Sequence, residues 1–130
     1  MSHETALLLW AFLAFQLKHF LCDFVLQTEY QVRTKAIYGH LGGILHVAIH
    51  IVGTIPALLI LGAGAQTIAI ILIAEAVIHY HVDWTKSFVD RTFKWGVTDH
   101  AYWILFGADQ LAHQLTYIGI VTVLAAGGLQ

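Results

Sequence analysis

The sequence predicts an all-α fold, an integral membrane four-helix bundle built from two helical hairpins. The 130-residue chain is 58% hydrophobic but only 11% charged, whereas soluble domains have about 25% charged residues. Four apolar segments each reach the roughly 20 residues needed to cross the hydrocarbon core of a bilayer. Within each segment, two histidine or aspartate side chains lie four residues apart, which places them on one helix face.

The four spans follow one another with short links, so we expect residues 1–130 to form a single transmembrane domain. The sequence before the first span lacks the basic region of a cleaved signal peptide, and we expect this span to be retained. Adjacent glycines at 42 and 43 predict a close approach between helices. The predicted spans cover about residues 5–27, 40–61, 66–88 and 100–126.

The basic residues predict the orientation of these spans. All but Lys18, which falls within the first span, lie in or beside the first and third links: Arg33, Lys35, Lys86, Arg91 and Lys94. Because basic residues favour the cytoplasmic side, we expect these two links inside the cell. Both termini are then outside, in the periplasm if the membrane is a bacterial inner membrane.

The paired polar residues share one depth. Counted from the basic ends at about 1.5 Å per residue, one member of each pair lies roughly 14–16 Å deep. Ionisable groups at membrane depth are costly and mark functional sites. We therefore expect the pairs to meet in one site that opens toward the cytoplasm. The candidate metal ligands are His19, Asp23, His46, His50, His79, Asp83, Asp109 and His113.

Imidazoles and carboxylates are ligands for zinc and for harder divalent ions. These candidates are too many for one tetrahedral ion, so they suit two ions, or one ion with an outer shell of carboxylates. The alternative is that they only form hydrogen bonds between helices, and for any single pair this is the simpler interpretation. The four pairs together favour a metal.

Two further residues are candidates for catalysis. Glu75 lies on the same stripe as the polar pair of its span, at roughly 20 Å depth, and is a candidate general base. A protonated, inert carboxyl is the alternative. Lys86 is a candidate phosphate ligand, although a side chain that reaches the lipid headgroups explains it more simply.

A weak internal repeat accompanies this pattern. A shift of the sequence by 60 residues brings three polar residues onto identical ones. With nine histidines in the chain, three such coincidences also arise by chance. If the repeat is real, the two hairpins are related by an axis along the membrane normal. A shift of 60 residues places His19 on His79, Asp23 on Asp83 and His40 on His100.

Four sequence elements together resemble a known family. They are HFLCDFVLQ (19–27), the spaced histidines 40, 46 and 50, HYHVDWTK (79–86) and DQLAH (109–113). The combination resembles the small bacterial and phage membrane proteins of domain-of-unknown-function family 3307. The resemblance covers nearly the whole chain. It implies a short polytopic helical protein and implies no activity.

These observations favour an intramembrane metal site, and most concretely a metal-dependent hydrolase acting on a lipid-linked or phosphate-bearing substrate. The alternative is a non-catalytic subunit or assembly factor of a larger membrane complex, with a protein partner or a second copy of the chain. Haem ligation or ion conduction forms a third class, disfavoured by the carboxylates and by the apolar outer halves of the spans. No basic stripe is present to bind nucleic acid.

Overall fold

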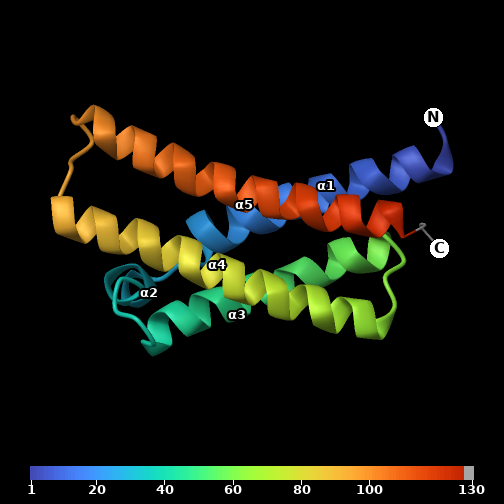
Figure 1. Ribbon diagram of the computed structural model, residues 1–130, viewed down its shortest axis with the longest axis horizontal. Coiled ribbons are helices and arrows are strands. Elements are labelled where there is room, and N and C mark those ends of the chain that lie inside the picture. Colours follow the sequence, from blue (N-terminus) through green and yellow to red (C-terminus); the bar gives the residue numbers. More distant parts are fainter. Residues whose placement is uncertain (128–130) are drawn as a thin grey trace.

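The computed structural model describes residues 1–127, and helices make up nearly all of them (Figure 1). Helix α1 (His3–Phe20) continues into a π-helical turn, η1 (Leu21–Val25). A short helix, α2 (Glu29–Thr34), precedes α3 (Leu41–Ile60), α4 (Ala65–Phe93) and α5 (His100–Ala126). The last three residues of the predicted domain, 128–130, lie outside the described residues.

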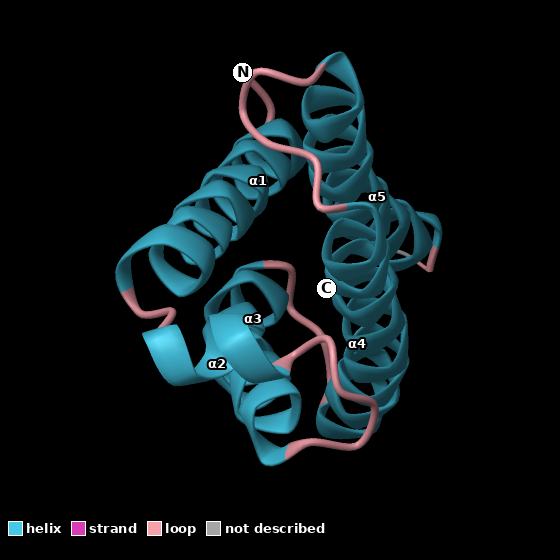
Figure 2. Cartoon of the chain, turned by 90° about the vertical axis from the view of Figure 1, so that its left-hand side faces the viewer, coloured by secondary structure: helices cyan, strands magenta, loops and turns pink. Residues whose placement is uncertain are grey.

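The four main helices form a ring in chain order. Helix α1 packs on α3, α3 on α4, α4 on α5, and α5 on α1, while α2 packs on α3 (Figure 2). The start of α1 and the α3–α4 turn lie at one end of the bundle, and α2 and the α4–α5 link lie at the other (Figure 1). The predicted all-α fold of four packed helices is confirmed.

Three of these helices are long and apolar enough to cross a membrane: the α1–η1 segment His3–Val25, α3 and α4. Helix α5 has 27 residues, about 40 Å at 1.5 Å per residue, which is also long enough. No 18-residue stretch of α5 is as apolar as those of the three other helices, because its middle carries Asp109, Gln110, His113 and Gln114. The apolar helices indicate membrane association.

The links differ most from the sequence expectation. Helix α4 continues to Phe93, beyond the predicted end at 88, and stops where Lys94 adopts a left-handed conformation (φ 54°). The first link contains α2, which starts with a capping box: Thr28 N donates to Gln31 Oε1 at 2.7 Å, and the Thr28 hydroxyl accepts from Gln31 N. The Thr-x-x-Gln spacing is the sequence signal for this helix.

The distribution of side chains suits a lipid environment. Large apolar side chains such as those of Val52, Ile73 and Leu111 are more than half exposed. The buried imidazole groups lie toward the end of the bundle that carries the basic links. Toward the other end lies an apolar core: Ala11, Phe15, Ala57, Leu58, Leu61, Ile71, Tyr117 and Val121.

The close approach predicted at the paired glycines occurs at Gly42. A Cβ atom there would overlap the Thr34 hydroxyl of α2, so a larger side chain would require that hydroxyl or α2 itself to move. At Gly43 a Cβ atom would lie 3.4 Å from the ring of Tyr80, an ordinary contact. Gly42 therefore holds the α2 segment, with its basic residues, against the bundle.

A candidate metal centre

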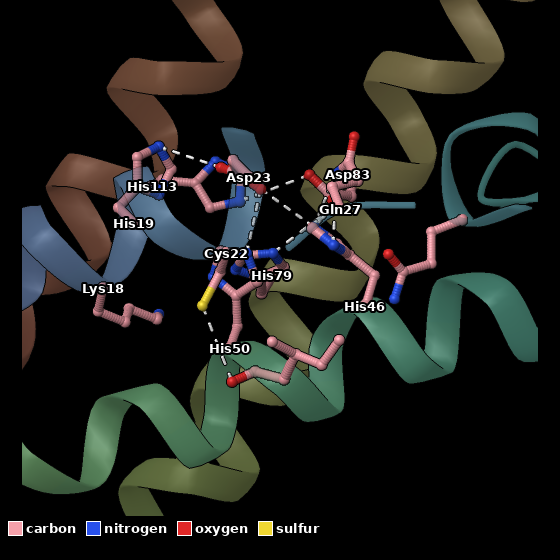
Figure 3. A network of polar contacts seen from close by, with 12 residues as sticks. Lys18, His19, Cys22, Asp23, Gln27, His46, His50, His79, Asp83 and His113 are labelled. Carbon is pink, nitrogen blue, oxygen red and sulfur yellow. Dashed lines mark hydrogen bonds and ion pairs between the residues drawn. The ribbon is translucent and has the colours of Figure 1, made fainter. Parts of the chain in front are cut away.

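Histidine and aspartate side chains from all four main helical segments converge inside the bundle (Figure 3). The imidazoles are almost completely enclosed: His50 is 0% exposed, His46 1%, and His79 and His113 2% each. They point toward one another and away from the lipid-facing surface. Residues from four separate helices thus share one buried site.

The π-helical turn positions Asp23. The Leu26 amide donates to the Leu21 carbonyl, five residues back, at 2.8 Å, so the turn holds one more residue than an α-helical turn. Asp23 reaches α3, while His19 stays within 3.2 Å of its carboxylate. The sequence predicted a helix over 5–27, and its apolar spacing gave no sign of this change. Such π-turns are frequent at functional sites.

Two carboxylates, Asp23 and Asp83, lie among the imidazoles. Asp23 Oδ1 is 3.0 Å from His50 Nε2 and 3.1 Å from His46 Nε2. Asp83 Oδ2 is 2.9 Å from the same His46 nitrogen and 3.6 Å from His79 Nε2. His46 therefore lies between the two carboxylates and joins the α1 side of the site to the α4 side.

Two overlapping groups of these residues could hold a metal ion, because one ligand atom from each residue lies within 4.8 Å of the others. Zinc takes four such ligands in a closed site, and three in a site that keeps one position open. The two groups are Asp23, His46, His50 and His79, and His79, Asp83 and His113. Because His79 belongs to both groups, the first group has the four ligands of a closed site only when His79 binds there rather than in the second group.

The second group has unpaired ligand atoms. Among the described residues, His79 Nε2, His113 Nε2 and Asp83 Oδ2 are buried without a hydrogen bond, since the approach of His46 to Asp83 is not aligned as one. His113 Nδ1 lies 2.8 Å from the Asp109 carbonyl oxygen, which can only accept, so neutral His113 offers a lone pair at Nε2. Each unpaired buried polar atom costs about 1–3 kcal/mol. A bound cation would remove that cost.

Two of the eight predicted ligands, His19 and Asp109, lie beside the two groups. Both His19 nitrogens have other partners: Nε2 is 2.8 Å from Gln110 Oε1, and Nδ1 is 3.1 Å from the Tyr117 hydroxyl. The Asp109 carboxylate lies 3.8 Å from His113 Nδ1. Residues in such positions orient the ligands of a metal site.

Glu75 lies in a second polar cluster, outside the ligand groups. Lys18 Nζ is 2.6 Å from Glu75 Oε1 and 3.0 Å from the Tyr117 hydroxyl, and the Thr54 hydroxyl donates to the same Glu75 oxygen at 2.9 Å. Tyr117 also contacts His19, which joins this cluster to the centre. Helical spacing alone predicts no partner for Lys18. The sequence signal for this pair is that a lysine and a glutamate each lie inside an otherwise apolar span, where opposite charges are expected to pair.

An open polar pocket of about 80 Å³ lies over the centre at its basic end. Asp23, Asp83 and Asp109 line it together with Lys35 and Lys86. Lys35 Nζ is 3.6 Å from Asp83 Oδ2, so one of the three carboxylates has a lysine partner. The pocket thus carries more acidic than basic groups around the unpaired ligand atoms, which favours a bound cation.

Over residues 11–128 the chain matches the family described as "Protein of unknown function (DUF3307)". The chain belongs to the DUF3307 family. The match contains every residue of the centre and confirms the resemblance drawn from the four sequence elements. No curated protein and no solved structure matches the chain. Membership of the DUF3307 family assigns no activity, so only the geometry of the site indicates its chemistry.

Breaking the Lys18–Glu75 pair tests how much an unpaired buried charge destabilises this bundle. Lys18→Met leaves the Glu75 carboxylate buried without its cation and should lower the free energy of unfolding by about 3–5 kcal/mol. The double variant Lys18→Met with Glu75→Gln should recover much of that loss. Unfolding of detergent-solubilised protein, followed by circular dichroism, measures both.

The exposed Arg33–Glu29 pair of α2 is the matched control, because Arg33→Met should cost about 1 kcal/mol or less. Equal losses of unfolding free energy for Lys18→Met and Arg33→Met would contradict the assignment of Lys18 and Glu75 as a buried ion pair. A double variant no more stable than Lys18→Met alone would contradict it too.

Proposed function

We propose that this protein is an integral membrane metalloprotein whose buried His/Asp centre holds one or two divalent ions, with zinc as the first candidate. We further propose that it hydrolyses a lipid-linked or phosphate-bearing substrate. The observation that supports this most is the second ligand group, His79, Asp83 and His113, in which Nε2 of both histidines is buried without a hydrogen bond. An ion held there would supply Lewis-acid chemistry, polarising the scissile group and activating water.

Three protein ligands leave one position of a tetrahedral ion open, as in catalytic zinc sites. Asp83 belongs to this group and also lines the polar pocket, so a substrate in the pocket reaches the open side of the site. Asp109 lines the same pocket, and its Oδ1 is buried without a hydrogen bond. We assign the general base to Asp109, and we give Glu75, which pairs with Lys18, a structural role.

The number of ions that the site can hold depends on which of the two ligand groups His79 joins. With His79 in the second group, the first group keeps three ligands, Asp23, His46 and His50. Asp83, whose Oδ2 lies 2.9 Å from His46 Nε2 and 3.6 Å from His79 Nε2, would then be within reach of ions in either group. Paired ions of this kind act together in many phosphate-cleaving enzymes.

The closed group supports the second candidate function. Asp23, His46, His50 and His79 would saturate a single tetrahedral ion, as in structural zinc sites. Such an ion would stabilise a non-catalytic subunit or assembly factor of a membrane complex. Haem is a poor fit, because the rings of His50 and His79 are 4.0 Å apart between centroids and leave no room for a porphyrin plane between them.

The proposed centre predicts the metal content of the protein. Protein purified without chelators should contain about one or two equivalents of a divalent metal, zinc first, by elemental analysis. His79→Ala removes the ligand common to both groups and should lower the content by at least about half. His81→Ala is the control, since His81 is exposed on the same helix and contacts the Val77 carbonyl. Folded wild-type protein without metal, or equal content in both variants, would rule out the centre.

Catalysis is tested on the same samples. Asp109→Asn should keep the metal and lower hydrolysis of a phosphate ester by about 10²–10⁴-fold, the usual contribution of a general base. Metal without any hydrolysis in the wild type would favour the structural role. Full activity in Asp109→Asn would assign the base to another residue.

We also propose that the basic links face the cytoplasm of a bacterial cell. Gly64 and Thr98 lie at opposite ends of the bundle, in the α3–α4 turn and the α4–α5 link. In a Cys22→Ser background, an impermeant thiol reagent added to intact inner-membrane spheroplasts should label Gly64→Cys and spare Thr98→Cys. The reverse pattern would invert the orientation.

A further inference from the structure

Two open apolar pockets, which together we call the α4–α5 groove, follow one another along the seam between α4 and α5 on the outer surface of the bundle. One part, of about 370 Å³, lies near the basic end beside Val82 and Ala112, and a second part, of about 540 Å³, continues past Ile78 and Gly119. Ile78 and Val82 are one helical turn apart on α4, so both parts lie along one face of that helix. Small side chains on α5 make the hollow.

The groove reaches the polar pocket. Lys86 and Asp109 line both the near part of the groove and the pocket over the metal ligands. From Lys86 to Ile71, at the far part, the groove follows 15 residues of α4, about 22 Å at 1.5 Å per residue. That exceeds half of a hydrocarbon core of about 30 Å. A molecule with a polar head and one long apolar chain can therefore occupy both spaces at once.

The charge at the junction changes with the metal. Three carboxylates and two lysines line the pocket, so its formal charge is −3 + 2 = −1 without an ion. One divalent ion makes it +1, and two make it +3. Lys35 already contacts Asp83 at 3.6 Å, whereas Lys86 has its nearest acidic group, Asp90, at 4.0 Å. Lys86 is thus the freer cation at the point where groove and pocket meet.

We propose that the substrate is a single-chain lipid phosphate: its phosphate binds in the pocket beside Lys86 and the ion, and its chain lies in the α4–α5 groove. This inference rests on the proposed metal centre and adds the substrate class and its binding mode. A phosphate matches the positive charge of the loaded pocket and offers several acceptor oxygens to the lysine and the ion. The chain matches a groove that opens directly to the bilayer.

Binding to metal-loaded protein in nanodiscs tests the substrate class. The probes are hexadecyl phosphate, hexadecanol and inorganic phosphate. Hexadecyl phosphate should bind at least about tenfold more tightly than either of the others, because only it uses pocket and groove together. Equal binding of hexadecyl phosphate and hexadecanol would overturn the phosphate subsite, and equal binding of hexadecyl phosphate and inorganic phosphate would overturn the groove.

Two variants separate head from chain. Lys86→Gln should weaken hexadecyl phosphate by about tenfold and leave hexadecanol unchanged. Gly119→Leu places a side chain in the groove, where a Cβ atom meets nothing within 4 Å, and should weaken both chain-bearing probes. Gly107→Leu is its control, because Gly107 is equally uncrowded on α5 but does not line the groove. Identical behaviour of the two leucine variants would overturn the chain site.

Metal content measured on the same samples separates the two proposals. Protein that takes up no metal overturns the metal centre, and this inference with it. Protein that holds metal but does not prefer hexadecyl phosphate overturns the lipid phosphate alone. Chelator-treated protein should bind hexadecyl phosphate more weakly than loaded protein, because the pocket is then negative.

Discussion

The structure depends on one constraint: charged and imidazole groups placed inside an apolar exterior must find partners in one another. Hydrocarbon offers them no hydrogen bonds, so each unpaired group carries a large cost. Asp23 and Asp83 meet this constraint by lying among imidazoles from neighbouring helices. The helices are therefore held in register by polar contacts in one half of the bundle and by apolar packing in the other.

The same constraint explains the irregular features of the fold. The π-turn after α1 brings Asp23 to the imidazoles of α3, and the polar middle of α5 supplies His113 and its neighbours at the cost of apolarity. Lys18 and Glu75 pair because each would otherwise be buried alone. Buried atoms without a hydrogen bond also occur at His50, Glu75 and Gln31, but those of the second group lie together, and a cation is the partner that suits them.

Much of this was predictable from helical spacing and composition, because membrane depth imposes strong patterns. The four helices, the inward polar pairs and the family all follow from the sequence. The π-turn did not, because a change of one residue per turn leaves the hydrophobic pattern intact. Helical spacing also could not show that His79 and His113 keep a ring nitrogen without a hydrogen bond while both nitrogens of His19 have partners. Those partners, Gln110 and Tyr117, lie on another helix.

The central claim is that the convergent imidazoles and carboxylates hold a divalent ion, and X-ray absorption at the edge of the co-purified metal tests it most directly. For zinc, we predict a first shell of nitrogen and oxygen atoms at about 2.0–2.1 Å, with the outer-shell scattering of imidazole rings. A shell of sulfur atoms at about 2.3 Å would instead place the metal at the single cysteine, Cys22. That result, or a shell of oxygen atoms without imidazole scattering, would contradict the account.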